Sequence, residues 1–316
     1  MNKKLLATFA NPGSAYRGAP FWAWNGLLEP AELRRQIRVM QRMGLGGFFM
    51  HARVGLATHY LSEDWFRAVD ACVDEAERHD MQAWLYDEDR WPSGAAGGLV
   101  TKNPRYRMQH AVVEIVDDPG ALQCSENILA ACTGRLDGAA LSHARAVNPR
   151  QLARPAAGEV LIVFRAEHDA CSDWFNGYTY LDTMNREAVA AFIHTTHAAY
   201  YRRYRSRFGT RIPGIFTDEP HHGKVLATSP WQKDAPPVMP WTRDLARIFK
   251  QRYGYDLRAH LHEVVFDVAG VRGCRARYDY HDCITSLFVE AFAQQIGAWC
   301  DTHNFQHTGH MLSEET

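Results

Sequence analysis

The stretch "PAELRRQIRVMQRMGLGGFFMHARVG", residues 30–55, contains two kinds of hydrophobic pattern. In its first half Leu33, Ile37 and Met40 fall at i, i+4 and i+7, which is the spacing of one face of an α-helix. Proline suits the first turn of such a helix, and glycine suits its C-terminal end. The second half is a short apolar run that turns polar at its end. The stretch therefore predicts an amphipathic helix followed by a β-strand.

The same unit recurs along the chain. Ser62 can cap a second helix, whose first turn carries two acidic residues, and Asn185 can cap a third. Further helices are predicted at residues 241–254 and around residues 284–299. Apolar runs that turn polar lie at residues 20–26, 45–55, 81–94, 212–222 and 305–315. The sequence therefore predicts about five parallel strands that alternate with helices.

The placement of the polar residues favours a barrel over an open sheet. Each predicted strand carries its polar cluster at its C-terminal end, where (β/α)8 barrels place their active sites. Open doubly wound sheets also bind ligands at that end, so this pattern alone leaves both architectures open. The sequence has no GxGxxG after a strand and no GxxxxGK[ST], which argues against a nucleotide-binding open sheet. We therefore expect an α/β fold of the (β/α)8 TIM-barrel type, incomplete at about five strands.

Residues 101–182 interrupt the β/α pattern. The helical period disappears there, and "HAVVEIVDD" (residues 110–118) and "GEVLIVFRAEH" (residues 158–168) have the composition of strands. We expect a β-rich insertion that follows the third barrel strand. On this division residues 1–100 form the first part of the barrel, and residues 183–316 form its truncated continuation.

The overall composition argues against several classes of function. The chain has 316 residues, of which 46% are hydrophobic and 22% charged, as in an ordinary globular protein. Its formal net charge is -1, and it has no block of lysine and arginine. We therefore expect neither nucleic acid nor a membrane as a partner. No run approaches the roughly 20 apolar residues of a membrane span.

The cysteines and the N-terminal residues indicate a cytoplasmic protein. The seven cysteines are odd in number and include no CxxC pair, which suits reduced thiols better than disulfides or a zinc site. The apolar run Leu5–Ala10 is too short for a secretory signal, and Asn11-Pro12 interrupts it. A cytoplasmic location is the expectation.

The sharpest candidate for chemistry is "GIFTDEPHH", residues 214–222. Asp218 and Glu219 follow an apolar strand and precede Pro220, which favours an extended backbone at Glu219. These carboxylates are expected at the mouth of the barrel. The alternative is an acidic pair that caps the next helix or forms an ion pair.

Two other strand ends carry candidate binding residues. In "YDEDRWPSG", Asp87 and Glu88 can accept hydrogen bonds from sugar hydroxyls, and Trp91 can stack on a sugar face. The alternative is a salt-bridged loop with the tryptophan in the core. In "FFMHARVG", His51 and Arg53 are two apart on one strand and therefore point to the same side. The alternative there is a structural histidine.

The last residues, "HTGHMLSEE", add two histidines and two carboxylates. His307 and His310 with Glu314 and Glu315 could ligate a metal, but their spacing matches neither HExxH nor HxH. Carboxylates have a clearer use in glycoside hydrolysis, which needs two Asp or Glu residues on either side of the bond that is cleaved. Carboxylates at different strand ends of one barrel meet that requirement.

The chain resembles a known family in four motifs. These are "PFWAWNGLLEPAELRRQIRVMQRMGLGGFFMHARVGLATHYLSEDWFRAV", "WLYDEDRWPSGAAGG", "GIFTDEPH" and "TGHMLSEE". Together they are similar to the catalytic barrel of glycoside hydrolase family 106 and its α-L-rhamnosidase-like relatives. The resemblance covers nearly the whole chain and is densest over residues 18–98. It implies an inverting exo-glycosidase that removes terminal α-L-rhamnose or a similar sugar from a plant polysaccharide or a glycoside.

The resemblance also implies roles for single residues. Glu219 is the leading candidate for the general acid, and either Glu314 or Glu315 is the candidate for the base that activates water. The expected sugar-binding residues are His51, Arg53, Asp87, Glu88, Trp91, Asp218 and His310. No cofactor is required on this pattern. Some relatives hold calcium near the sugar, and the sequence leaves open whether this chain does.

Members of that family have a complete barrel, whereas this sequence stops after about the fifth barrel strand. We therefore expect a truncated reading frame or a fragment with low activity. Two rival interpretations remain. One is a non-catalytic carbohydrate-binding protein that keeps the aromatic and acidic cleft. The other is a metal-dependent barrel hydrolase that uses the histidines with zinc or manganese.

Overall fold

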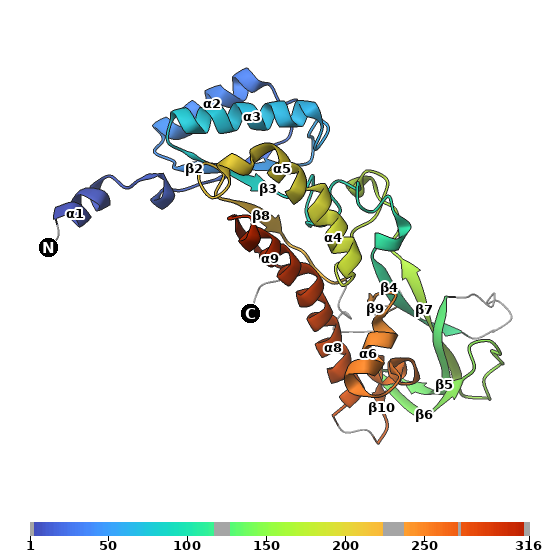
Figure 1. Ribbon diagram of the computed structural model, residues 1–316. Coiled ribbons are helices and arrows are strands. Elements are labelled where there is room, and N and C mark those ends of the chain that lie inside the picture. Colours follow the sequence, from blue (N-terminus) through green and yellow to red (C-terminus); the bar gives the residue numbers. More distant parts are fainter. Residues whose placement is uncertain (1–2, 117–126, 224–236, 271–272, 313–316) are drawn as a thin grey trace.

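The computed structural model describes residues 3–116, 127–223, 237–270 and 273–312. In these ranges the chain forms two β-sheets with helices packed around them (Figure 1). One sheet is entirely parallel and carries the predicted polar strand ends. The other is mostly antiparallel.

The parallel sheet has the strand order β1-β2-β3-β8-β11. Its strands are β1 (Phe21–Trp24), β2 (Gly47–Ala52), β3 (Gln82–Tyr86), β8 (Gly214–Asp218) and β11 (Gln306–His310). The expected parallel β/α architecture is confirmed. A closed (β/α)8 barrel is not seen in the described residues, because these five strands form half of one, with β1 and β11 at its two edges.

Amphipathic helices cover the outer face of this half-barrel. The helices that pack around it are α2 (Pro30–Arg42), α3 (Glu63–Arg78), α4 (Arg186–Thr195), α5 (His197–Tyr204) and the run of α8 (Arg275–Phe288), the π-helical segment η7 (Val289–Ala293) and α9 (Gln294–Thr302). Helix α1 (Lys3–Ala10) extends away from the sheets, and α6 (Leu245–Tyr253) and α7 (Leu261–Val265) lie beside the second sheet (Figure 1). Helices α2 and α3 lie side by side above β2 and β3, and α8, η7 and α9 form one continuous rod (Figure 1). As predicted, the Ser62 side chain caps α3 by accepting from the Trp65 amide at 3.2 Å.

The second sheet has the order β10-β6-β5-β7-β4-β9. Its strands are β4 (Gln109–Val116), β5 (Ile128–Asp137), β6 (Ala140–Val147), β7 (Val160–His168), β9 (Val238–Trp241) and β10 (Asp267–Val268). Strands β9 and β10 come from beyond residues 101–182, so the sheet is larger than the segment in which the sequence predicts it. Trp241, which the sequence places in a helix, ends β9, and α6 begins only at Leu245.

The main core lies between the parallel sheet and its helices. Trp24, from the aromatic run before the first helix, is 2% exposed and packs edge-to-face on Trp65 of α3, with ring centroids 5.0 Å apart. Pairs of this kind add to the free energy gained by burying the rings. None of the helices in the described ranges combines the length and apolar character that crossing a bilayer needs.

Candidate active site

A cavity of about 540 Å³ opens at the C-terminal ends of the parallel strands. It is lined by Phe21, Ala23, His51, Arg53, Trp91, Asp218, Glu219 and His310. The register of the sheet explains this grouping, because Ala23 pairs with His51 across β1 and β2, and Asp218 pairs with His310 across β8 and β11. Six of the residues singled out from the sequence therefore meet here. Asp87 and Glu88 do not line the cavity, and Glu314 and Glu315 lie outside the described residues.

Asp218 is the centre of the polar contacts in this cavity. Its Oδ2 accepts a hydrogen bond from the Tyr86 hydroxyl at 2.8 Å, and its Oδ1 lies 2.8 Å from His310 Nε2. His51 Nε2 lies 3.6 Å from Oδ2. Burial by itself would raise the pKa of Asp218, but the polar groups of His51, His310 and Tyr86 lower it to about 2. The Asp218 carboxyl group is therefore ionised near neutral pH, and we call this carboxylate with its three polar neighbours the ionised hub.

His51 combines a fixed ring with an Nε2 atom that lies 3.6 Å from Asp218 Oδ2, too far for a hydrogen bond. The ring stacks on Phe21 at 5.0 Å and meets the Tyr86 ring edge-on at 4.1 Å. Within the described ranges, its buried Nε2 has no hydrogen-bond partner. Buried polar atoms in native proteins are almost always paired, and an exception in a cavity wall marks a place for a ligand's polar group. A sugar hydroxyl would satisfy it.

Glu219 does not have the extended backbone that the following proline favours. Its φ is +48°, in the left-handed region, and its amide donates to the His310 carbonyl at 3.0 Å. Such a conformation costs a non-glycine residue about 1–3 kcal/mol and is typical of functional sites. Neighbouring residues in a strand point to opposite faces, so the turn has a direct consequence. It brings the side chains of Asp218 and Glu219 into the same cavity.

Asp87 and Glu88, which the sequence predicts in the wall of the site, are buried and do not line this cavity. The Asp87 carboxylate accepts from the Ser93 hydroxyl at 2.5 Å and from the Thr217 hydroxyl at 2.6 Å. Burial raises its pKa to about 7, although these two hydroxyls act in the opposite direction. Ser93 Oγ also accepts from the Asp218 amide at 2.8 Å. Asp87 therefore holds the strand end that carries Asp218.

Glu88 holds the loop that follows β3. Its carboxylate accepts from four backbone amides, those of Asp89, Gly94, Ala96 and Gly97, at 2.5–2.9 Å. Burial raises the pKa of Glu88 to about 8 against the opposing effect of these four donors. With both oxygens used inside the protein, Glu88 is unavailable to a ligand. It fixes the loop on which Trp91 stands.

Tyr86, Ser93 and Thr217 are supporting residues that the sequence did not single out. A signal for the loop existed in "SGAAGG", because small residues with positive φ allow successive amides to converge on one acceptor. Ala96 and Gly97 indeed have φ of +50° and +61°. The partners of the Tyr86 and Thr217 side chains could not be found this way, because they depend on contacts between strands.

The same cavity offers possible metal ligands. Asp218, Glu219 and His310 each place one ligand atom within 4.8 Å of the others. Calcium takes six to eight oxygen ligands, whereas a carboxylate and imidazole set suits transition metals. Asp218, Glu219 and His310 alone therefore do not supply a calcium shell. His310 Nε2 is also engaged with Asp218.

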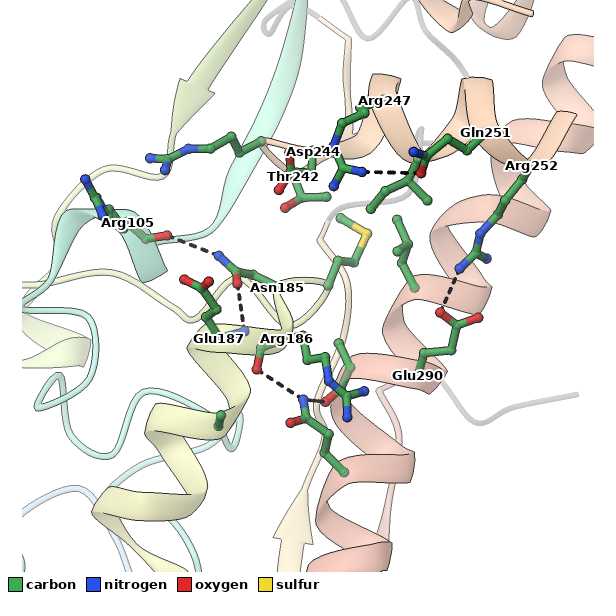
Figure 2. Close-up of a pocket in the computed structure, with 17 residues that line it drawn as sticks. Arg105, Asn185, Arg186, Glu187, Thr242, Asp244, Arg247, Gln251, Arg252 and Glu290 are labelled. Carbon is green, nitrogen blue, oxygen red and sulfur yellow. Dashed lines mark hydrogen bonds and ion pairs between the residues drawn. The ribbon is translucent and has the colours of Figure 1, made fainter. Parts of the chain in front are cut away.

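A larger hollow of about 880 Å³ lies between α4, α6 and η7 (Figure 2). Its wall includes Arg105, Arg186, Arg243, Arg247 and Arg252. Some of this charge is compensated, since Arg252 pairs with Glu290 at 2.7 Å (Figure 2). The two hollows share no lining residue. We place the candidate active site in the smaller one, because the carboxylates, histidines and tryptophan converge there.

Comparison with known proteins supports the fold. No family model matches the chain, and no curated protein sequence matches it. Among solved structures, a rhamnosidase from Novosphingobium sp. PP1Y is similar, with a TM-score of 0.62 and 12% sequence identity. The match covers 100% of this chain and 48% of that one, so the chain spans about half the length of that structure. At this identity the likeness concerns the fold alone: the chain has a fold similar to that of this rhamnosidase, and membership of family 106 stays a prediction.

Proposed function

We propose that this chain carries the catalytic part of a glycoside hydrolase that removes a terminal sugar, with α-L-rhamnose or a similar sugar as the leading candidate. The observation that carries the proposal is the convergence at one set of strand ends. The left-handed turn at Glu219 brings a carboxylate into a cavity that also holds the ionised Asp218, two histidines, an arginine and a tryptophan. The similarity of the fold to that of a rhamnosidase agrees with this assignment.

In this proposal Glu219 is the general acid that protonates the departing oxygen. A base on the opposite face of the sugar would activate water, and Glu314 or Glu315 is the proposed source. The family resemblance implies inversion, for which the two carboxyl groups lie about 6.5–9.5 Å apart. Asp218 is a positioning residue, because its carboxylate is taken up by Tyr86 and His310.

The remaining cavity residues fit the recognition of a sugar. His51 Nε2 and the Arg53 guanidinium can hydrogen-bond to hydroxyl groups. Phe21 and Trp91 offer apolar ring surface for the C–H face of a pyranose. The mixture of a few polar groups with aromatic walls is typical of small-molecule sites.

The test is hydrolysis of a panel of aryl glycosides, led by aryl α-L-rhamnoside, at high enzyme concentration. Glu219→Gln keeps the size of the side chain and removes the proton donor, so we expect kcat to fall about 10²–10⁴-fold. Sugar binding, measured by calorimetry, should change little. Glu187→Gln, an exposed glutamate beside the arginine-rich hollow, is the matched control.

Two outcomes would change the assignment. Full activity in Glu219→Gln would remove Glu219 from the acid role. Sugar binding by the folded wild-type chain with no turnover across the panel would favour a non-catalytic carbohydrate-binding protein.

A metal-dependent hydrolase is the second candidate, because Asp218, Glu219 and His310 lie close enough to share an ion. This function predicts that a chelator abolishes hydrolysis and that zinc or manganese restores it. Activity that is indifferent to the chelator would eliminate this candidate while leaving the first intact.

A further inference from the structure

Trp91, in the cavity wall, is braced by a segment far away in the sequence. We call residues 172–177 the insertion loop, since they lie in the segment between β7 and α4. Trp174 in this loop donates its indole N–H to the Trp91 carbonyl at 2.6 Å. The two indole rings are 5.3 Å apart and inclined at 64°. They therefore form a corner in which the two ring planes are inclined to each other.

The insertion loop is attached at two further points to residues 87–98, the loop that follows β3 and carries Trp91. The Arg90 guanidinium donates to the Asp173 carbonyl at 3.1 Å. Asn176 has a left-handed backbone with φ of +52°, which asparagine tolerates better than most residues. Its side-chain amide donates to Asp89 Oδ2 at 3.0 Å and to the Gly97 carbonyl at 2.9 Å. Together with the four amides held by Glu88, these contacts make the corner rigid before any ligand arrives.

Three features of the corner suit a ligand better than internal packing alone. Both tryptophans are only half-buried. Trp91 lines the cavity and Trp174, whose ring packs against it, does not, so part of the exposed ring surface of the pair lies beyond the cavity wall. The polar N–H of Trp174 is already used on a backbone carbonyl, which leaves the ring to present apolar surface. Rigid, half-exposed aromatic residues provide contact area with little loss of conformational entropy.

From these contacts we propose that Trp91 and Trp174 form a second sugar subsite, which holds the pyranose ring next to the terminal sugar in the cavity. This inference rests on the proposed function, which places the terminal sugar beside Glu219 and Trp91. It adds that the preferred substrate is the end of an oligosaccharide or polysaccharide. A glycoside with a small leaving group would leave Trp174 without a sugar ring to contact.

The test compares two substrates, methyl α-L-rhamnoside and the disaccharide α-L-rhamnosyl-rhamnose. The measured quantity is the ratio of kcat/KM for the disaccharide to kcat/KM for the methyl glycoside. In Trp174→Ala this ratio should fall about tenfold, which corresponds to about 1.4 kcal/mol at 25 °C. In Trp174→Phe, which keeps a ring and is expected to fold, it should fall about threefold. Tyr278→Ala, which removes a 72% exposed aromatic residue of α8, is the control and should leave the ratio unchanged.

A merely structural role gives a different result. If Trp174 only positions Trp91, both substrates lose kcat/KM together and the ratio stays constant in both Trp174 variants, which would overturn the subsite. If the wild-type chain has no turnover, calorimetric binding of the same two sugars separates the two proposals. Tighter binding of the disaccharide that is lost in Trp174→Ala would support the subsite although the hydrolase assignment fails. Equal binding of the two sugars, or no binding, would refute it.

Discussion

Replacing Tyr86 by phenylalanine tests whether Asp218 is held as a buried anion. The change removes one hydroxyl, which is buried in the wild type and donates to Asp218 Oδ2 at 2.8 Å. The neighbours of Asp218 lower its pKa from an ordinary 3.8 to about 2. That difference corresponds to roughly 2 kcal/mol of folding stability, since one pKa unit is about 1.36 kcal/mol. The hydroxyl is one of three groups responsible, and hydrogen bonds to charged groups contribute about 1.5–3 kcal/mol. We therefore expect a loss of about 1–2 kcal/mol at pH 7.

The stability lost in Tyr86→Phe should depend on pH, because it comes from a hydrogen bond to an ionised carboxyl group. A carboxyl group with a lowered pKa in the folded state stabilises the protein above its unfolded pKa of about 3.9. This contribution is lost as the pH falls toward about 2, the pKa of Asp218 in the folded chain. The difference between the wild type and Tyr86→Phe should therefore be constant above about pH 4 and shrink as the pH falls from about 4 to about 2. Urea unfolding at a series of pH values, followed by tryptophan fluorescence, measures it directly.

Tyr280→Phe is the matched control for this experiment. The Tyr280 hydroxyl is also buried, but it donates to the neutral Pro240 carbonyl at 2.6 Å. Its loss should cost about 1 kcal/mol at every pH in the series. If the stability lost in Tyr86→Phe were equally independent of pH, the inference that Asp218 is held as a buried anion would be wrong.

Three further predictions concern the supports of the site. Glu88→Gln should destabilise the fold by about 2–6 kcal/mol in urea unfolding at pH 9, where the Glu88 carboxyl group, with a pKa of about 8, is ionised. The reason is that an amide N–H₂ would face two of the four backbone donors and leave them unpaired. The exposed control Glu187→Gln should change stability by less than about 0.5 kcal/mol. Gly309→Ala should prevent β11 from pairing with β8, since the added Cβ would lie 2.0 Å from a carbonyl oxygen of β8. The control Gly138→Ala has open space around the added Cβ and should lower the free energy of unfolding by only about 1 kcal/mol. Soluble yield and urea unfolding measure the difference between the two variants. Asn176→Gly keeps the left-handed backbone but loses both side-chain hydrogen bonds to residues 89 and 97. Hydrogen exchange of the backbone amides in residues 89–97 should therefore accelerate several-fold, with little change in the global free energy of unfolding. An unchanged exchange rate would contradict the role of Asn176 in holding this loop.

The parts of the fold that were predictable from the sequence are those set by local periodicity. The stripes of α2 and α3 and the five polar-ended strands follow from spacing alone, because burial of one helix face requires it. The second sheet was only partly predictable. Strands β9 and β10 have four and two residues, too few for a recognisable alternation, and they exist because they pair with β4 and β6. Pro240 in β9 fits this edge position, since it has no N–H to donate.

The sequence predicted which residues would gather at the strand ends, but it did not predict how each of them is used. The rule that strand ends meet correctly brought His51, Asp218 and His310 to one cavity. It could not tell that Glu88 would be used by four amides of its own loop, because the conformation of that loop depends on several positive φ angles. The rule for residues before proline gave the wrong backbone at Glu219, where the bond to β11 outweighs the local preference.

Because Asp218 pairs with His310, the geometry of the site depends on whether the edge strand β11 stays paired with β8. His310 is the last residue of β11, and β11 is an edge strand among the described residues. Edge strands open locally at lower free energy than central ones. Each opening breaks the hydrogen bond from the Glu219 amide to the His310 carbonyl and removes the imidazole from Asp218 in the same event. The hydrogen-exchange rate of the Glu219 backbone amide therefore reports the fraction of time for which β11 is unpaired and Asp218 and Glu219 lack their contacts with His310.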